Sequence, residues 1–157
     1  MNTKRRTVLG LGLAGLGLCG TGLAHAQAKP AAGRKIVLGQ SVPLTGAASE
    51  IGLAFAAGAK LYVDAFNARK NNPGWNFELR QLDDGYEPAK ATANAKKLLE
   101  DGADVLFGFV GTASADAGAA VAKAENAIFF GPFAASDTLR DASHTYVFHV
   151  RPSMADE

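Results

Sequence analysis

Hydroxyl side chains follow an unbroken apolar segment in the second half of the chain. After Asp104, residues 105–110 read Val-Leu-Phe-Gly-Phe-Val, and Gly111-Thr112-Ala113-Ser114 comes directly after them. Such an apolar segment is typical of a central parallel strand that is buried on both faces. The Ala-rich stretch 115–126 predicts a helix, whose first N–H groups lack intrahelical partners and whose dipole favours negative charge. The pattern therefore predicts a site for a small anion or polar ligand at Thr112.

Other residues whose types allow chemistry indicate structural roles. Asp83 and Asp84 are adjacent at the end of a predicted strand, where capping of a loop is a simpler role than paired acid–base catalysis. His144 and His149 have no further ligand at a metal-binding spacing. The sequence contains no G-x-S-x-G nucleophile motif, and its single cysteine is Cys19. We therefore predict no catalytic residue, no metal and no cofactor.

The charge balance argues against a nucleic-acid partner. Three of the 16 Lys and Arg residues lie before residue 27. From Gln27 onward the chain therefore has 13 basic and 15 acidic residues, a net charge near −2. A nucleic-acid-binding domain requires a basic surface to neutralise phosphates. The composition, with 48% hydrophobic and 20% charged residues, is that of a globular protein.

The N-terminus has the pattern of an export signal. Arg5 and Arg6 precede a weakly hydrophobic, Gly-rich segment at residues 10–23, as in twin-arginine signals. An Ala-His-Ala sequence follows, which predicts cleavage between Ala26 and Gln27. We therefore expect the protein to act in the periplasm after removal of the signal.

Two alternatives for this region are weaker, and one question stays open. The apolar segment is too short for the roughly 20 residues that span a membrane. A G-x-G-x-x-G match at residues 10–15 has no strand before it and is not a dinucleotide site. Lys4 stands where twin-arginine signals more often have Ser or Thr, so the general secretion route remains possible. We assign residues 1–26 to the signal and 27–34 to a linker.

The rest of the chain alternates strand-like with helix-like segments. This alternation predicts an α/β fold, a doubly wound parallel sheet with right-handed crossovers. Polar loops near Thr45, Asp84, Thr112 and Ala134 would then meet at the carboxyl edge of the sheet, where such folds bind ligands. We predict strands at 35–42, 77–82, 104–110, 127–130 and 145–150, and helices at 51–71, from 88 to 101, at 115–126 and from 136 or 137 to 140.

One helix has a clear apolar stripe. Phe55, Ala59, Tyr62 and Phe66 recur at spacings of four, three and four within residues 51–71. These spacings place the four side chains on one face of the helix. We expect that face to be part of the hydrophobic core.

The ordered set of these features resembles the periplasmic substrate-binding proteins of branched-chain amino acid ABC transporters, which have the type I periplasmic binding protein fold. The resemblance implies the strand order 2-1-3-4-5 and two lobes that close on a ligand. It implies that residues 35–150 form the first lobe, that residues 151–157 begin the crossover, and that the second lobe is missing from this sequence. The residues that carry it are Pro43-Leu44-Thr45-Gly46 with Gly52, Asp83-Asp84 with Pro88 and Ala91, Gly108 with Thr112 and Ser114, and Pro132 to Leu139.

The resemblance also implies the ligand contacts. In this family a hydroxyl-bearing turn after the third strand grips the ligand carboxylate, and Thr112, with Ser114 in the same turn, matches it. The loop after the fourth strand offers a backbone carbonyl to the ligand amino group, matching Ala134. The next position usually bears a Thr hydroxyl, and this chain has Ala135 there. The missing hydroxyl puts an ordinary α-amino-acid ligand in doubt.

Two further residues would face the body of the ligand. Ile51 matches a position that often touches the ligand side chain, and Phe133 offers an apolar surface if it faces the cleft. The resemblance then implies a non-catalytic receptor that delivers an amino acid or related small carboxylic acid to the permease and ATPase subunits of an ABC importer. The alternatives are the ligand-sensing domain of a signalling receptor and an exported α/β hydrolase. The absent nucleophile motif counts against the hydrolase.

Overall fold

The fold is one parallel sheet with helices on both faces. The computed structural model describes residues 33–72 and 74–156, and the predicted export signal and its cleavage site lie outside them. The strands have the order β2-β1-β3-β4-β5 and every pair is parallel, as predicted. The elements are β1 (Lys35–Val42), α1 (Ser49–Asn67), β2 (Asn76–Asp83), α2 (Pro88–Glu100), β3 (Val105–Phe107), α3 (Thr112–Glu125), β4 (Ile128–Phe130), the 3₁₀ helix η1 (Asp137–Arg140) and β5 (Val147–Phe148).

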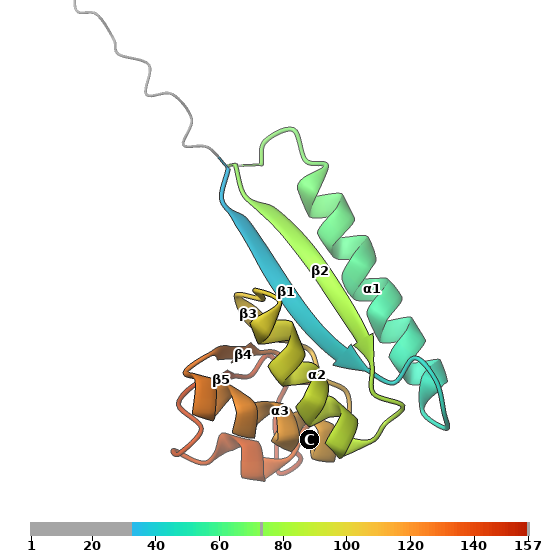
Figure 1. The fold of residues 1–157 in the computed structure, drawn as a ribbon, viewed down its shortest axis with the longest axis vertical. Coiled ribbons are helices and arrows are strands. Elements are labelled where there is room, and N and C mark those ends of the chain that lie inside the picture. The colour runs from blue at the N-terminus through green and yellow to red at the C-terminus, as the bar shows by residue number, and fades with distance from the viewer. Residues whose placement is uncertain (1–32, 73, 157) are drawn as a thin grey trace, which may run out of the picture.

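The alternation of side chains along β1 shows why the sheet has two covered faces. Val37 packs into the main core together with Leu98 of α2 and Ala119 of α3. The next residue along β1, Leu38, faces α1 and its Phe66. This two-residue period is that of an extended strand whose side chains point alternately to opposite faces. Figure 1 accordingly shows α1 on one side of the sheet and α2 and α3 on the other.

Two of the predicted strands are shorter than expected. β3 has three residues instead of 104–110, and β5 has two instead of 145–150. Gly108 has φ +60°, a left-handed conformation that ends the regular pairing of β3. Two residues farther on, Val110 forms an isolated bridge with Phe133, which joins the loops after β3 and β4.

The helix boundaries also differ from prediction. α1 ends at Asn67 and not at residue 71, because the Asn67 side-chain amide bonds to both the N–H and the C=O of Phe77 at 2.9 and 2.7 Å. α3 begins at Thr112, three residues before the predicted start. Thr112 is therefore the first residue of the helix.

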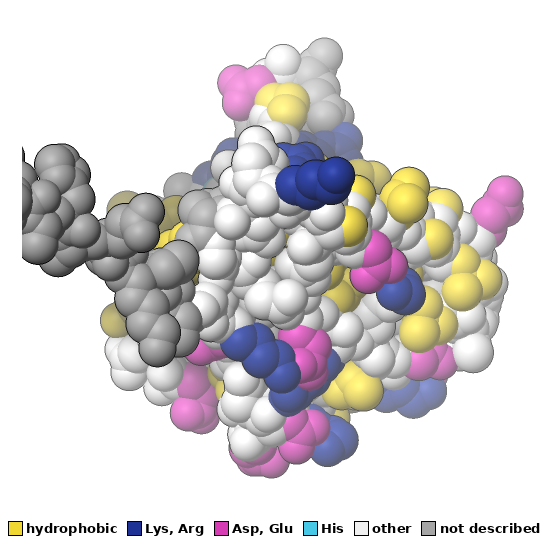
Figure 2. All heavy atoms as spheres, turned by 90° about the horizontal axis from the view of Figure 1, so that it is seen from above, with side chains coloured by type: hydrophobic (Ala, Val, Ile, Leu, Met, Phe, Trp, Pro, Cys, Tyr) yellow, Lys and Arg dark blue, Asp and Glu magenta, His cyan; other side chains and the backbone are white. Residues whose placement is uncertain are grey.

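The prediction that the apolar stripe of α1 lies in the hydrophobic core was wrong in part. The buried residues of this helix are Gly52, Ala56 and Val63, whereas the Tyr62 side chain is 64% exposed. The reason is that α1 lies over β1 and β2, and the strands beyond them have no helix on this face among the described residues. An apolar groove of about 420 Å³ results, lined by Ile36, Leu38, Ala59, Tyr62, Val63, Phe66, Phe77, Val105, Phe107, Ile128 and Phe130. Figure 2 shows hydrophobic side chains exposed on one face of the molecule.

Candidate ligand site

The hydroxyl of Thr112 lies at the amino end of α3 without a partner. Gly111, with φ +88°, is the N-cap residue, and no side chain caps the helix. Thr112 is exposed, and its hydroxyl makes no hydrogen bond to any residue that the structure describes. A role as a side-chain cap, the structural alternative for this residue, is thus excluded by the geometry. The hydroxyl and the first N–H groups of α3 can donate to an acceptor.

Backbone hydrogen bonds hold the loops after β3 and β4 together. The Gly111 N–H donates to the Phe133 carbonyl at 3.1 Å, and the Phe133 N–H donates to the Phe109 carbonyl at 2.8 Å. Because Gly111 is bonded to Thr112, these contacts fix Thr112 close to Phe133. Two predicted site residues from different loops therefore lie at the same edge of the sheet.

Phe133 also connects this edge to α1. Its ring lies 4.9 Å from the ring of Phe55, centroid to centroid, and the Arg151 guanidinium carbon lies 5.4 Å from its centroid. Phe133 and the predicted residue Ile51 line a shallow hollow of about 440 Å³, together with Glu50, Ala54 and Phe55. The apolar side of the candidate site is therefore formed by the start of α1 and the loop after β4.

The other predicted residues have less open positions. Ala134 is 5% exposed, and no donor among the described residues reaches its carbonyl oxygen. The Ala135 carbonyl accepts the Met154 N–H at 2.9 Å, which ties this loop to the C-terminal segment. Ser114 is 2% exposed, so its side chain faces the interior instead of the hollow.

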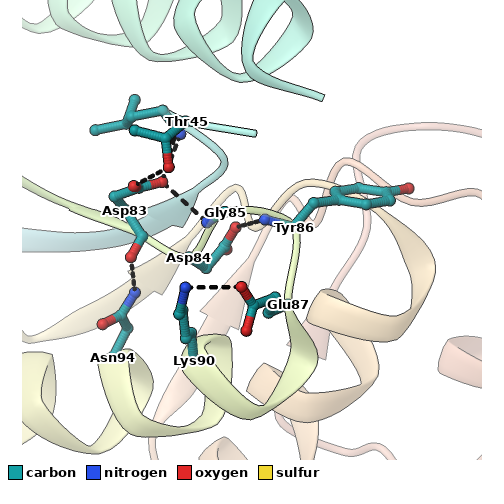
Figure 3. A network of polar contacts seen from close by, with 9 residues as sticks. Thr45, Asp83, Asp84, Gly85, Tyr86, Glu87, Lys90 and Asn94 are labelled. Atoms are coloured by element: carbon teal, nitrogen blue, oxygen red, sulfur yellow. Dashed lines mark hydrogen bonds and ion pairs between the residues drawn. The ribbon is translucent and has the colours of Figure 1, made fainter. Parts of the chain in front are cut away.

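A cluster of hydrogen bonds centred on Asp83 joins the loop after β1 to the loop after β2 (Figure 3). Asp83 Oδ2 accepts the Thr45 hydroxyl at 2.5 Å. Asp83 Oδ1 accepts the N–H groups of Leu44, Thr45 and Gly85 at 2.8, 3.1 and 2.9 Å. We call this cluster the Asp83 clamp. It confirms that the paired aspartates have a loop-capping role, and it fixes the loop that leads into α1 and Ile51.

The clamp shifts the pKa of Asp83. The Thr45 hydroxyl, followed by the Gly85 N–H, stabilises the carboxylate and lowers its pKa from 3.8 to about 2. Each of these donors forms a stronger hydrogen bond to the charged carboxylate than to the protonated acid. Asp83 is thus held as an anion that organises backbone N–H groups.

Asp84 has the opposite shift. Its side chain is inaccessible to solvent, and burial raises its pKa, although the Ser41 hydroxyl at 2.8 Å and the Tyr86 N–H at 2.9 Å partly offset that effect. Asn94 of α2 donates to the Ser41 hydroxyl at 3.1 Å and to the Asp83 carbonyl at 3.0 Å. These contacts attach the loop after β2 to β1 and to α2.

Sequence reasoning missed Tyr86. A Cβ atom at Gly111 would lie 2.4 Å from Cε2 and 2.7 Å from the hydroxyl oxygen of Tyr86, so this ring lies directly on Gly111. Nothing in the sequence pattern distinguishes Tyr86 from a solvated loop residue. Its backbone has φ +67°, which only the structure reveals.

The described residues hold no sign of other chemistry. No group of three or more His, Cys, Asp or Glu side chains in the described ranges is placed to hold a metal ion. His149 instead lies 3.1 Å from the Leu139 carbonyl through Nε2, a structural contact. No helix in the described part of the chain is both long and apolar enough to cross a membrane.

The architecture and the sequence both match one group of proteins. The profile of the family described as periplasmic binding protein matches residues 35–157. The chain belongs to the periplasmic binding protein family. The expected resemblance is thereby confirmed, and the strand order is that of the type I fold. A comparison of this periplasmic binding protein with curated proteins returns no match.

Solved structures give the same assignment. A possible leucine/isoleucine/valine-binding protein from Rhodopirellula baltica is 31% identical, with a TM-score of 0.66 over 74% of this chain and 32% of that one. A solute-binding protein of an ABC transporter from R. palustris, in complex with benzoate, is 26% identical, with a TM-score of 0.64 over 76% and 33%. The substrate-binding protein of a branched-chain amino acid transporter from Streptococcus pneumoniae, in complex with isoleucine, is 24% identical and shares the fold, with a TM-score of 0.70 over 76% and 34%.

These findings define the general role of the chain. The family and the solved neighbours are solute-binding proteins and not enzymes, which confirms the non-catalytic prediction and excludes the hydrolase. Membership implies an extracytoplasmic location. The periplasmic binding protein described here spans about a third of the length of the solved structures it matches.

Proposed function

We propose that this periplasmic binding protein is the receptor of an ABC importer and that its ligand is a small carboxylate, an amino acid or a related carboxylic acid. The permease and ATPase subunits of that importer would be its partners. The observation that carries the proposal is the exposed Thr112 hydroxyl, without a partner among the described residues, at the amino end of α3. A carboxylate there would accept this hydroxyl and would also gain from the helix dipole, by about 0.3–1 kcal/mol.

The apolar hollow at Ile51 and Phe133 supports a ligand with an apolar body, because Phe133 is hydrogen-bonded to Gly111, the residue before Thr112. Ile51 is 55% exposed and Phe133 is 40% exposed, and both line the hollow. The Ala134 carbonyl, which no described donor reaches, would accept a ligand amino group if one is present. Aliphatic and aromatic acids both fit this combination, and solved neighbours hold isoleucine and benzoate.

The proposal extends to the organisation of the chain. Residues 1–26 would be the export signal, cleaved between Ala26 and Gln27, and residues 27–34 a linker. Residues 35–150 would form the first lobe, and residues 151–157 would lead into the crossover. The hydrogen bond from the Met154 N–H to the Ala135 carbonyl supports only the last of these assignments, because it joins the segment 151–157 to the loop after β4.

A ligand screen with one variant tests the proposal. Amino acids, aromatic acids, short fatty acids and the corresponding amides are titrated by NMR into the full-length protein and into its Thr112→Val variant. We expect carboxylates to bind best, and Thr112→Val to weaken them by about 1–3 kcal/mol, because valine keeps the shape but leaves a charged acceptor without its donor. Thr92→Val is the matched control, since the Thr92 hydroxyl bonds to the Pro88 carbonyl on α2. Best binding of uncharged amides, with no effect of Thr112→Val, would contradict the carboxylate assignment.

A further inference from the structure

Tyr86 is an aromatic residue in an unusual backbone conformation beside the candidate site. It belongs to the loop after β2, has φ +67°, and its side chain is 50% exposed. A non-glycine residue at positive φ costs free energy and persists only where its surroundings hold it there, and such residues cluster at functional positions. The contacts of Tyr86 therefore show how its positive φ is held and where its side chain is directed.

The loop is held from its buried side. The Tyr86 N–H donates to Asp84 Oδ1 at 2.9 Å, and the Glu87 N–H donates to the Asp84 carbonyl at 2.9 Å. The Asp84 carboxylate is inaccessible to solvent and accepts the Ser41 hydroxyl from β1. Figure 3 shows the Tyr86 ring pointing away from these polar contacts. The polar network thus fixes the backbone and directs the ring outward.

The ring reaches the amino end of α3. It lies on Gly111, where any Cβ atom would collide with it, and Gly111 is bonded to Thr112. β2, which precedes Tyr86, and β4, which precedes Phe133, lie on opposite sides of β3 in the sheet. Tyr86 and Phe133 therefore approach the loop after β3 from two sides. The Tyr86 hydroxyl makes no hydrogen bond to the described residues.

We propose that Tyr86 is a specificity-determining residue of the ligand site, whose hydroxyl donates a hydrogen bond to the acidic group of the ligand beside Thr112. The inference rests on the proposed function and adds a second hydroxyl donor, from a different loop, to that site. A carboxylate has two oxygens, so that one can accept from Thr112 and the other from Tyr86. The hollow at Ile51 and Phe133 would then receive the rest of the ligand.

The alternative is that Tyr86 serves only to pack on Gly111. Tyr86→Phe separates the two roles, because phenylalanine keeps the ring and loses the hydroxyl. The purified ¹⁵N-labelled full-length protein is titrated by NMR with benzoate, with isoleucine and with neutral benzamide. We expect Tyr86→Phe to weaken benzoate and isoleucine about 10-fold or more, and benzamide less, because a hydrogen bond to a charged acceptor is the stronger one. Tyr62→Phe, an exposed tyrosine on α1, should change none of the three affinities.

A chemical measurement makes the test independent of any variant. Tetranitromethane nitrates accessible tyrosine rings, and the side chains of Tyr86 and Tyr62 are 50% and 64% exposed. Benzoate should slow the nitration of Tyr86 and leave that of Tyr62 unchanged. Tyr62 serves here as a control within the same molecule.

The outcomes separate this inference from the proposed function. If the carboxylates bind and Thr112→Val weakens them, but Tyr86→Phe leaves them unchanged, Tyr86 only packs and the inference is wrong while the function stands. Equal losses for benzoate and benzamide, or equal nitration of Tyr86 with and without benzoate, would also overturn it. If neither carboxylate binds the unmodified full-length protein at millimolar concentration, the proposed function fails and this inference with it.

Discussion

Adjacent aspartates at the end of β2 carry opposite pKa shifts, because their side chains point to different surroundings. Asp83 meets N–H groups and a hydroxyl at the exposed edge of the sheet, and its pKa falls to about 2. Asp84 turns inward, and burial raises its pKa. The pair shows that a two-residue motif, which in sequence resembles paired acids, can serve two loops in different ways.

The low pKa of Asp83 predicts an acid dependence of stability. Because the folded state holds this carboxyl below its ordinary pKa of 3.8, the contribution of Asp83 is fully present above that pH. It is lost as the pH falls from 3.8 through about 2. Thr45→Val removes the largest cause of the shift, so we expect the Asp83 pKa to rise towards 3.8 and the variant to lose less stability over this acid range.

The measurement is an NMR titration of the Asp83 carboxyl combined with urea unfolding at several acid pH values. Thr45→Ser is the matched control, because serine keeps the hydroxyl that donates to Asp83. Asp84 titrates in both proteins, so the difference between them reports on Asp83. An unchanged Asp83 pKa in Thr45→Val would contradict the clamp.

At the scale of elements, the first turns of α1 depend on a close approach to the loop after β1. A Cβ atom at Gly52 would lie 1.9 Å from the Pro43 carbonyl oxygen, whereas a Cβ atom at Gly58 would have nothing within 4 Å. Both glycines lie in the same helix. Gly52 thus lets α1 pack on the loop that the Asp83 clamp holds, and it fixes the neighbouring Ile51.

The two glycines make a matched pair for a stability experiment. We expect Gly52→Ala to lower the free energy of unfolding by about 1–3 kcal/mol or more, because the backbone must move to admit the methyl group. Gly58→Ala should raise it by about 0.5–1 kcal/mol, since alanine is the better helix former at an open position. Urea unfolding of both variants checks this. Similar effects of the two substitutions would show that α1 does not rest on the Pro43 carbonyl.

The elements also show how far sequence patterns reach. The predicted strand 35–42 coincides with β1, and Pro88 begins α2 as expected, because both signals are local. The end of β3 depends on the positive φ of Gly108, and the exposure of Tyr62 depends on which strands lie under α1. The sequence pattern indicated Thr112 as a site residue, because its hydroxyl precedes a predicted helix. Tyr86 did not, because its place on Gly111 results from contacts between two distant loops.

At the scale of the whole molecule, the uneven covering of the sheet predicts dye binding. The apolar groove beside α1 is open in the described structure, and Phe130, 42% exposed, lines it. We expect the dye ANS to fluoresce with the folded chain and Phe130→Ser to reduce the signal. Phe148→Ser is the control, because Phe148 is 49% exposed and does not line the groove. Equal fluorescence of both variants would place the dye elsewhere.

The export signal gives a prediction for the complete precursor. Replacement of Arg5 and Arg6 by lysine should block export by the twin-arginine route, because that signal is defined by its paired arginines. Cell fractionation and immunoblotting would show the precursor retained in the cytoplasm. Undiminished export of the variant would assign the signal to the general secretion route.

The strand order has a consequence for how the chain folds during synthesis. β1 and β2 pair along their full eight residues, and β3, β4 and β5 then follow one another on the free edge of β1. Each new strand can therefore add to an edge that already exists, and none has to insert between two paired strands. Because chains emerge from the ribosome in sequence order, this sheet can grow strand by strand in the direction of translation.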